Sequence, residues 1–550
     1  MRMKQNMGTK TSWSVMLLML IFFVACSTND TPLPERPSSD TTPTVEPVKT
    51  AAEVLATIQG VSDIQETKDA GNYDVTTFCF EQPIDHSNPA AGTFKQYCTL
   101  HYKGPNEVTV LHTQGYSSKE PKEMKQNDFI TNLDGNFLEV EHRYYMHSPI
   151  NKGADYYDPN YWAYNTAAQS TADLHAIVTV LKNTGCFKGK WVSTGVSKDG
   201  ILTALYAYYY PNEMDVYVPF CAPFCTEAES TGIGKWLTRK CAEGSELQRR
   251  VWEILGEMAT DTKLREEMTL LHKQANPNNA YLQNYNVKQT MCLLIYEYMK
   301  NMFHKFSYYN TDTWDGVIPP KGYDAKFYYL FTMLGKDGYA RRLNELRALW
   351  NYTTEEELNE YEYDTYDDYE TDDEDDDWQD IEDVDGEAAA RRSAQAMTFE
   401  SLMKQIYFVH AAKELGYFLY DWTVLPENHV LPATNLEWFK KVQSITTTRD
   451  KYRLTYDDGK LMKDFLDFVK NNRNRNKCKM LFVYGGNDPW TGAAIPDPDP
   501  DDPYVKKYVV ARGVHSGNIN YTGHYTAQDK DYIMNTVKQW LRGELLQGTK

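Results

Sequence analysis

The chain has 550 residues, of which 41% are hydrophobic and 13% aromatic, so its composition is that of a globular protein rather than a disordered one. Its formal net charge of −20 argues against nucleic acid as a partner, because phosphate binding needs a basic surface. That charge has one source, since residues 355–387 contain 20 Asp and Glu and no Lys or Arg. Without them the 77 acidic residues fall to 57, equal to the 57 Lys and Arg.

The first 26 residues have the pattern of a targeting segment. Basic residues at positions 2, 4 and 10 precede the apolar run Val15–Cys26, which is short for a spanning helix. The run ends in Phe-Val-Ala-Cys and turns polar, which resembles a bacterial lipoprotein signal with Cys26 as the lipidated residue. Phe23 departs from that pattern, which prefers Leu, and a secretory signal with an incidental cysteine is the alternative.

Residues 27–50 are rich in Pro, Thr and Ser, which predicts a tether between the lipid and a folded domain. We therefore expect an exported lipoprotein, periplasmic or on the cell surface. The only membrane contact in this interpretation is the N-terminal lipid.

Strand and helix signals alternate after the tether, which predicts a parallel sheet covered by helices. Apolar runs next to turn residues predict strands, and apolar residues at helical spacing that end at Gly or Pro predict helices. The expected strands are two within 75–104 and one each in 107–116, 136–145, 190–196 and 215–220, and the expected helices are 167–185 and 198–211.

Amphipathic helical segments dominate residues 226–458, and the strand pattern returns at 478–490 and 505–515, before a final helix at 527–546. The sequence thus predicts one α/β domain in two parts, 51–225 and 459–550, interrupted by a largely helical cap at 226–458. The acidic tract 355–387 lies inside the cap. Its dense like charges predict a solvated segment, and it lacks the spaced Asp/Asn-Gly pattern of the alternative, a calcium loop.

Eight cysteines remain besides Cys26, in a chain expected to be exported. Cys79 and Cys98 lie on two expected neighbouring strands, and Cys221 and Cys225 are close in sequence, so a disulfide is compatible with each pair. The sequence has no paired CxxC motifs and no His-Cys cluster with zinc spacing. We expect neither a metal nor another cofactor.

The stretch STGVSKDG places Ser197 directly after an expected strand and before an expected helix. This turn exposes a serine hydroxyl above a sheet edge and directs the helix N-terminus at developing negative charge. The backbone N–H of Lys198 could then serve an oxyanion. The strict hydrolase pattern has glycine at the position of Asp199, so the motif alone is weak.

A serine nucleophile needs a base, and the base needs an acid that orients it. VYGGNDPW places Asp488 just past a strand, and ARGVHSGN places His515 just past the next one. His524 is the other histidine after Asp488, but it is farther from the strand end. Ser, Asp and His in this order, each after a strand, predict the catalytic triad of a hydrolase. HTQGY, after an earlier strand, offers Gly115 and Tyr116 as a second oxyanion donor.

Six motifs together resemble those of the secreted bacterial prolyl tri-/tetrapeptidyl aminopeptidases, serine peptidases related to prolylcarboxypeptidase and dipeptidyl peptidase II. They keep their order across residues 75–546: FEQPIDHSNPAAGTFKQY, EHRYY, residues 169–173, GVSKDG, GGNDPW and GVHSGN. The resemblance implies an α/β-hydrolase fold with a helical cap, and cleavage of short peptides from a free N-terminus, often after proline. It assigns Ser197 as nucleophile, Asp488 as acid and His515 as base.

Such an aminopeptidase needs a carboxylate for the substrate ammonium. The related peptidases have an acidic residue near the end of the cap, and AKELGYFLYDW resembles that region, so Glu414 is the candidate. A solvated helix charge is the alternative. For Glu141 and Arg143 in EHRYY we expect a buried structural ion pair. Trp490 and Tyr417 are candidates for a proline-sized pocket or, equally, for core packing.

The sequence therefore predicts a lipid-anchored, exported serine exopeptidase that releases tripeptide-like fragments from free peptide N-termini. An esterase or lipase with the same triad is one alternative. A surface lipoprotein that binds without catalysis, on a hydrolase fold, is the other.

Overall fold

The computed structural model describes residues 49–68, 74–113, 128–150, 155, 158–227, 229–230, 232–233, 235–236, 239, 406, 409–420 and 453–546. All of them belong to one structural unit, Lys49–Lys550. The predicted signal, the acidic tract and nearly all of the predicted cap lie outside the described residues.

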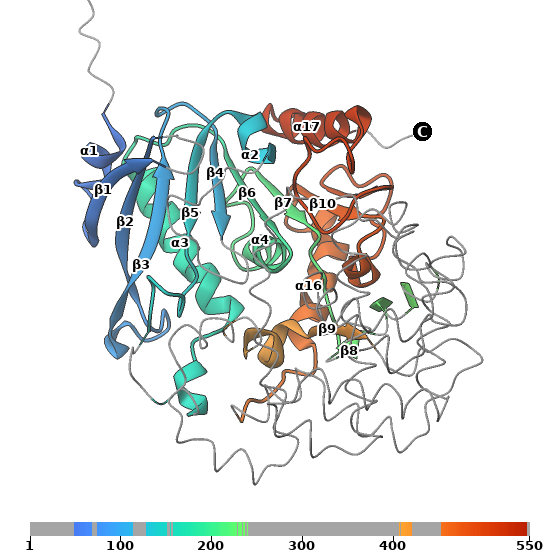
Figure 1. Cartoon of the computed structure of the whole chain (residues 1–550), viewed down its shortest axis with the longest axis horizontal. Coiled ribbons are helices and arrows are strands. Elements are labelled where there is room, and N and C mark those ends of the chain that lie inside the picture. Colours follow the sequence, from blue (N-terminus) through green and yellow to red (C-terminus); the bar gives the residue numbers. More distant parts are fainter. Residues whose placement is uncertain are drawn as a thin grey trace, which may run out of the picture. The chain divides into compact units, whose positions relative to one another are not determined.

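The strands and helices follow one another along the chain as shown in Figure 1. Their bounds are α1 Ala51–Leu55, β1 Val61–Lys68, β2 Asp74–Pro83, η1 Pro89–Ala91, β3 Thr93–His101, β4 Thr109–Thr113, α2 Asp128–Leu133, β5 Asn136–Val140, η3 Pro159–Trp162, α3 Ala167–Asn183, β6 Trp191–Val196, α4 Lys198–Tyr209, β7 Val216–Phe220, β8 Glu229–Ser230, η6 Ala411–Leu415, β9 Tyr417–Tyr420, α16 Lys460–Asn471, η7 Asn472–Asn474, β10 Met480–Gly485, η8 Pro489–Ala493, β11 Val505–Val510 and α17 Ala527–Leu541.

A nine-stranded sheet has the strand order β1-β2-β3-β5-β4-β6-β7-β10-β11. Strands β4, β5, β6, β7, β10 and β11 pair in parallel, whereas β3 is antiparallel to both β2 and β5. This order, with its crossover of β4 and β5, is that of the α/β-hydrolase fold, so the predicted fold class is confirmed. In such a sheet the carboxyl ends of the parallel strands meet at one edge, where ligands bind.

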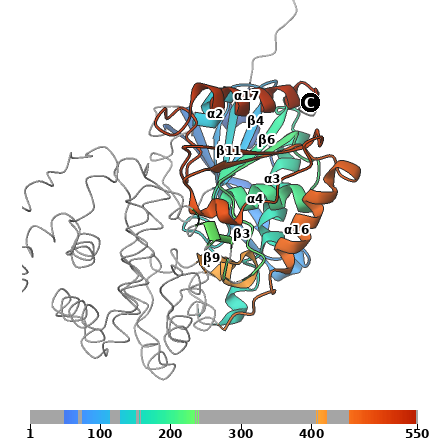
Figure 2. The same ribbon diagram turned by 90° about the vertical axis from the view of Figure 1, so that its right-hand side faces the viewer.

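Helices cover both faces of the sheet, and each face has its own hydrophobic core (Figures 1 and 2). Alternate residues of one strand point to opposite faces, so Trp191 packs in the core with α3, α4 and α16, and Val192 in the core with α2 and α17. The central parallel strands β5, β7 and β10 are buried along their whole length, as expected for a parallel sheet covered on both faces.

Two of the helices that pack on the sheet, α3 and α17, begin at clear capping residues. Thr166 accepts the N–H of Gln169 at the start of α3, and Thr526 forms a capping box with Asp529 at the start of α17. Such caps supply partners for N–H groups that lack an intrahelical acceptor.

One expectation about local structure is wrong. The strand expected over 136–145 ends at Val140, so the EHRYY motif is irregular backbone. Of the two disulfides that the sequence leaves possible, neither is present, since Cys79, Cys98, Cys221 and Cys225 are free cysteines. In the β2–β3 register, Cys98 lies opposite Phe78 and Cys79 opposite Tyr97, so the first two thiols project to opposite faces of the sheet.

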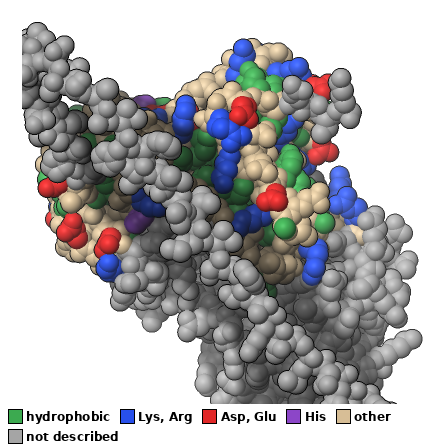
Figure 3. All heavy atoms as spheres, turned by 90° about the horizontal axis from the view of Figure 1, so that it is seen from above, with side chains coloured by type: hydrophobic (Ala, Val, Ile, Leu, Met, Phe, Trp, Pro, Cys, Tyr) green, Lys and Arg blue, Asp and Glu red, His purple; other side chains and the backbone are tan. Residues whose placement is uncertain are grey.

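The surface seen from the α17 side carries Lys, Arg, Asp and Glu side chains interspersed, rather than a patch of one sign (Figure 3). Within the described residues, no helix combines the length and hydrophobicity needed to cross a bilayer.

Candidate active site

The predicted nucleophile lies on a sharp turn between β6 and α4. Ser197 has φ 61° and ψ −120°, a strained conformation for a residue with a side chain, and its N–H donates to the carbonyl of Phe220 at 2.9 Å. The turn is so tight that a Cβ on Gly195 would lie 2.5 Å from the Cβ of Asp199. The glycine two residues before the serine is therefore required by close approach. The turn has the strand–serine–helix geometry of a nucleophile elbow.

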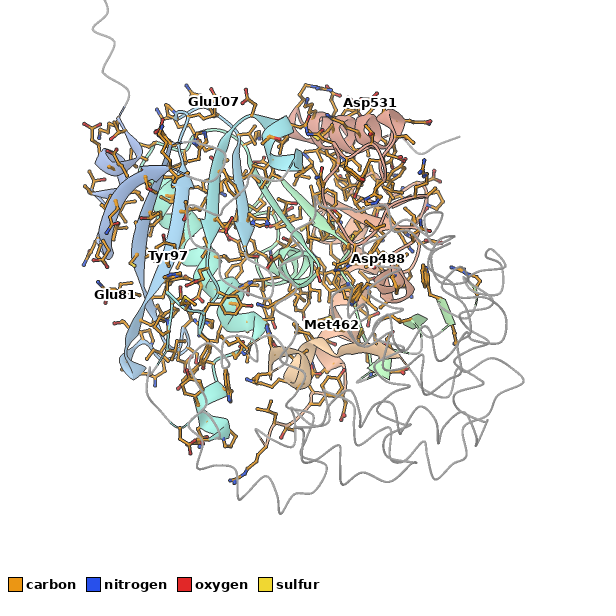
Figure 4. All side chains as sticks on the ribbon, in the orientation of Figure 1. Glu81, Tyr97, Glu107, Met462, Asp488 and Asp531 are labelled. Carbon is orange, nitrogen blue, oxygen red and sulfur yellow. The ribbon has the colours of Figure 1, made fainter. Side chains whose placement is uncertain are left out.

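The predicted acid lies just past the carboxyl end of β10 (Figure 4). Asp488 is fully buried and caps the short helix η8, with its Oδ1 accepting the N–H of Trp490 at 3.1 Å. This bond fixes the plane of the carboxylate. The other oxygen, Oδ2, is thereby directed away from η8.

The predicted base lies in the loop after β11. His515 is buried, and its Nδ1 lies 2.8 Å from Oδ2 of Asp488. The indole of Trp490 packs on the imidazole, with ring centroids 4.0 Å apart. Asp488 thus bonds His515 rather than His524, whose ring packs against Tyr521. A carboxylate on Nδ1 holds the imidazole in the tautomer that leaves Nε2 as the proton acceptor.

The loop that carries His515 lies against the nucleophile turn. Gly517 packs so closely on Val196, the residue before Ser197, that a Cβ on Gly517 would lie 2.8 Å from Cγ2 of Val196. The thiol of Cys221, just after β7, contacts the carbonyls of Val514 and Ser516 on either side of His515, at 3.6 and 3.9 Å. Residues almost 300 positions apart in the chain therefore meet at one sheet edge. A serine, an imidazole and a carboxylate in this setting can perform acyl transfer.

Cys221, Asp488 and His515 offer sulfur, oxygen and nitrogen atoms within 4.8 Å of one another. A transition metal bound here would need the Cys221 thiol in its deprotonated form. It would also need an Asp488 carboxylate that does not accept a hydrogen bond from the imidazole N–H. Burial, followed by the charge of Asp488, holds the pKa of the Cys221 thiol well above its usual value. The carboxylate is already bonded to His515. The chemistry of these donors thus fits an acid–base pair with a packed thiol better than a metal site.

The side chain of Glu414 faces the start of α3. Its Oε1 accepts the backbone N–H of Ala167 and lies 2.7 Å from Nε2 of His410. A carboxylate at a helix N-terminus stabilises that helix. The predicted role of Glu414 in holding a substrate ammonium stays a prediction.

The remaining predicted site residues are placed as follows. Trp490 is buried against His515, which accounts for its packing without a proline pocket. Tyr417 begins β9, but its side chain lies outside the described residues. Gly115, Tyr116 and the predicted lipidation site Cys26 also lie outside them. Lys198 is the first residue of α4, and its role as an oxyanion donor stays a prediction.

The EHRYY motif has a role that was not expected from the sequence. A buried ion pair does form in this motif, but Arg143 pairs with Asp173, through bonds of 2.7 and 2.8 Å, and not with Glu141. Glu141 instead accepts the hydroxyl of Ser148 at 2.6 Å. His142 and Tyr145 bond the two residues that follow Ser197. The unusual density of polar and aromatic residues at a strand end was the available signal.

Part of the chain is similar to a known peptidase family. Residues 46–246 match the family described as "PS-10 peptidase S37". The prolyl tri/tetrapeptidyl aminopeptidase of Streptomyces mobaraensis is 31% identical over 167 residues, which is 30% of this chain and 32% of that protein. The chain therefore matches about a third of the length of that relative.

Solved structures to which the chain shows some similarity include a proline iminopeptidase from Mycobacterium smegmatis and an acetyl xylan esterase from Paenibacillus sp. R4. The first is 9% identical with a TM-score of 0.28, over 84% of this chain and 98% of that one. The second is 11% identical with a TM-score of 0.23, over 34% of this chain and 57% of that one. Scores this low establish no relationship in function.

Proposed function

We propose that this chain, whose residues 46–246 match the PS-10 peptidase S37 family, is a serine exopeptidase that releases short fragments from free peptide N-termini. The observation that carries the proposal is the hydrogen bond of 2.8 Å between His515 and Asp488, at the sheet edge that also holds Ser197 on its strained turn. The relative from Streptomyces mobaraensis, a prolyl tri/tetrapeptidyl aminopeptidase, supports tripeptide-sized products and a preference for proline.

In the proposed reaction, Oγ of Ser197 attacks the scissile carbonyl and His515 takes the hydroxyl proton. Asp488 holds the imidazole and stabilises the imidazolium. The N–H of Lys198, at the start of α4, donates to the oxyanion. The imidazolium then protonates the leaving amine, and water attacks the acyl-enzyme by the same route in reverse.

The test is digestion of a defined peptide library by the purified chain, with the products identified by mass spectrometry. We expect N-terminal fragments of about three residues, no cleavage of amine-blocked peptides, and a loss of at least about 10³-fold in kcat for Ser197→Ala. Internal cleavage of blocked peptides would contradict exopeptidase action. Faster hydrolysis of acyl esters than of free-amine peptides would instead identify an esterase.

Recognition of the substrate ammonium by Glu414 belongs to the same proposal. Glu414→Gln keeps an oxygen that can accept from Ala167 but removes the charge. A rise in KM of about tenfold or more for free-amine substrates, with kcat maintained, would support ammonium binding. An unchanged KM would contradict ammonium binding and leave Glu414 its contacts with the start of α3 and with His410.

We also propose that the protein is an exported lipoprotein anchored through Cys26, on the strength of the N-terminal sequence pattern alone. The wild-type protein should partition into the detergent phase of a Triton X-114 extract. The variant Cys26→Ala should remain in the aqueous phase or keep its signal uncleaved. Aqueous partitioning of the wild-type protein would contradict the anchor.

A further inference from the structure

The nucleophile turn holds a strained residue, and something must keep it strained. A non-glycine residue with the dihedral angles of Ser197 is strained and persists only where its surroundings fix it. The two residues that follow, Lys198 and Asp199, both have buried polar side chains. Polar groups are rarely buried without partners, so these side chains indicate where the turn is held.

Asp199 connects the turn to two other strand ends. Its Oδ1 accepts the hydroxyl of Thr113, the last residue of β4, at 3.0 Å, and lies 2.9 Å from Nε2 of His142, two residues after β5. Burial alone would raise the pKa of Asp199, but the hydrogen bond and charge of His142 outweigh it and lower the pKa below its usual value. The Asp199 carboxylate is thus a charged acceptor for two buried groups, the Thr113 hydroxyl and the His142 imidazole.

Lys198 is held from the same direction. Its Nζ donates to Oη of Tyr145 at 2.9 Å and lies 4.7 Å from the centre of that ring. Tyr145 also packs edge-on against His142, with ring centroids 5.3 Å apart. The segment that contains both residues is itself fixed by the buried pair Arg143–Asp173. Lys198 and Asp199, the two residues after the serine, therefore fix the turn to the segment that contains His142 and Tyr145.

We propose that Asp199 is a positioning residue, which with Thr113 and His142 holds the strained nucleophile turn so that Ser197 and the N–H of Lys198 keep the places that catalysis needs. The side chain that breaks the strict Gly-x-Ser-x-Gly pattern is then a functional replacement for the glycine. This inference rests on the proposed function only in taking Ser197 as the nucleophile.

The test compares two substitutions of Thr113. Thr113→Val keeps the shape of the side chain but removes the donor to Asp199, and Thr113→Ser keeps the hydroxyl. We expect Thr113→Val to lower kcat about tenfold with KM within about threefold, and Thr113→Ser to restore kcat to within about threefold of wild type. Asp199→Ala, which removes the acceptor itself, should lower kcat about a hundredfold.

A matched control lies at the other end of the same strand. Thr109 is equally buried and accepts from Nδ2 of Asn136 at 3.2 Å, far from the turn along β4. Thr109→Val should lower the melting temperature about as much as Thr113→Val does and leave kcat within about twofold of wild type. If both valine variants lose kcat equally, the loss reflects general instability and the proposal is wrong.

A second readout separates this proposal from the peptidase proposal. The rate constant for labelling of Ser197 by a fluorophosphonate at saturation needs no peptide substrate, and it should fall in step with kcat across the variants. If wild type labels but cleaves no peptide, the peptidase proposal fails and the labelling rates still test Asp199. Wild-type labelling rates in Thr113→Val, no rescue by Thr113→Ser, or no label on wild-type Ser197 would each overturn the positioning role.

Discussion

The two halves of the proposed active site, the nucleophile turn and the acid–base pair, are held in different ways. The nucleophile turn is fixed by side chains, since Asp199 and Lys198 are bonded to Thr113, His142 and Tyr145. The acid–base pair is fixed mainly by backbone. In its two loops Asn487 donates to the carbonyl of Gly513 at 2.8 Å, and Gly486 to that of Val510 at 2.7 Å. The strained residue thus needs buried polar partners, whereas unstrained loops need only close backbone packing.

The largest expected effect on kcat comes from a substitution in the acid–base pair, the half of the site that is fixed mainly by backbone hydrogen bonds. Asp488→Asn preserves the fold of the loop but offers His515 an amide in place of a carboxylate, so the imidazole can adopt the wrong tautomer. We expect kcat to fall about 10⁴-fold with little change in KM, measured by steady-state hydrolysis of a free-amine peptide. The melting temperature, followed in parallel, should change little. A variant with more than a tenth of wild-type kcat would exclude Asp488 as the acid.

A smaller loss of kcat is expected when a methyl group is added at Gly485, in the loops that hold the acid–base pair. A Cβ on Gly485 would lie 2.6 Å from the carbonyl oxygens of Gly513 and Val514, which precede His515. Gly485→Ala should therefore displace the histidine and lower kcat about a hundredfold. The control is Gly104→Ala, because a Cβ there meets nothing closer than Glu107 at 3.8 Å. Equal kinetics for both variants would show that backbone packing does not position His515.

The smallest expected effect is on the free energy of unfolding, and it comes from Lys198 in the nucleophile turn, the half of the site that is fixed by side chains. Burial lowers the pKa of Lys198 to about 7, from 10.5, so between these values the unfolded chain binds more protons than the folded one. Stability from this group therefore rises as pH rises from about 7 to about 10. Between about pH 7 and pH 9, wild type should gain about 2 kcal/mol in free energy of unfolding relative to Lys198→Met, measured by denaturant titration. A pH-independent difference between the two proteins would contradict the burial of a titrating lysine.

The sequence predicted the nucleophile turn well because its signals are local. The expected strand and helix around Ser197 fall within two residues of β6 and α4, since apolar runs, Gly195 and the stop at Pro211 are all read from one short stretch. The order of Ser197, Asp488 and His515 along the chain can likewise be read from the sequence without knowing how far apart the three residues lie in the fold.

Partners from distant parts of the chain could not be predicted. Thr113 and His142 precede Asp199 by 86 and 57 residues, and no periodicity relates them. Glu414 contacts the start of α3, 247 residues earlier, where sequence alone shows only an acidic residue in a helical segment. Whether Cys79 and Cys98 could form a disulfide was open for a related reason, because a shift of one residue in strand register moves a side chain to the other face.

The central claim is that Ser197 is the nucleophile and that the His515–Asp488 pair activates it. The most direct measurement is reaction with a fluorophosphonate, followed by mass spectrometry of the digested protein to locate the adduct. We expect a single adduct on Ser197, absent in Ser197→Ala and formed at least about a hundredfold more slowly in His515→Ala. An adduct on another residue, or peptide cleavage that survives Ser197→Ala, would contradict the account.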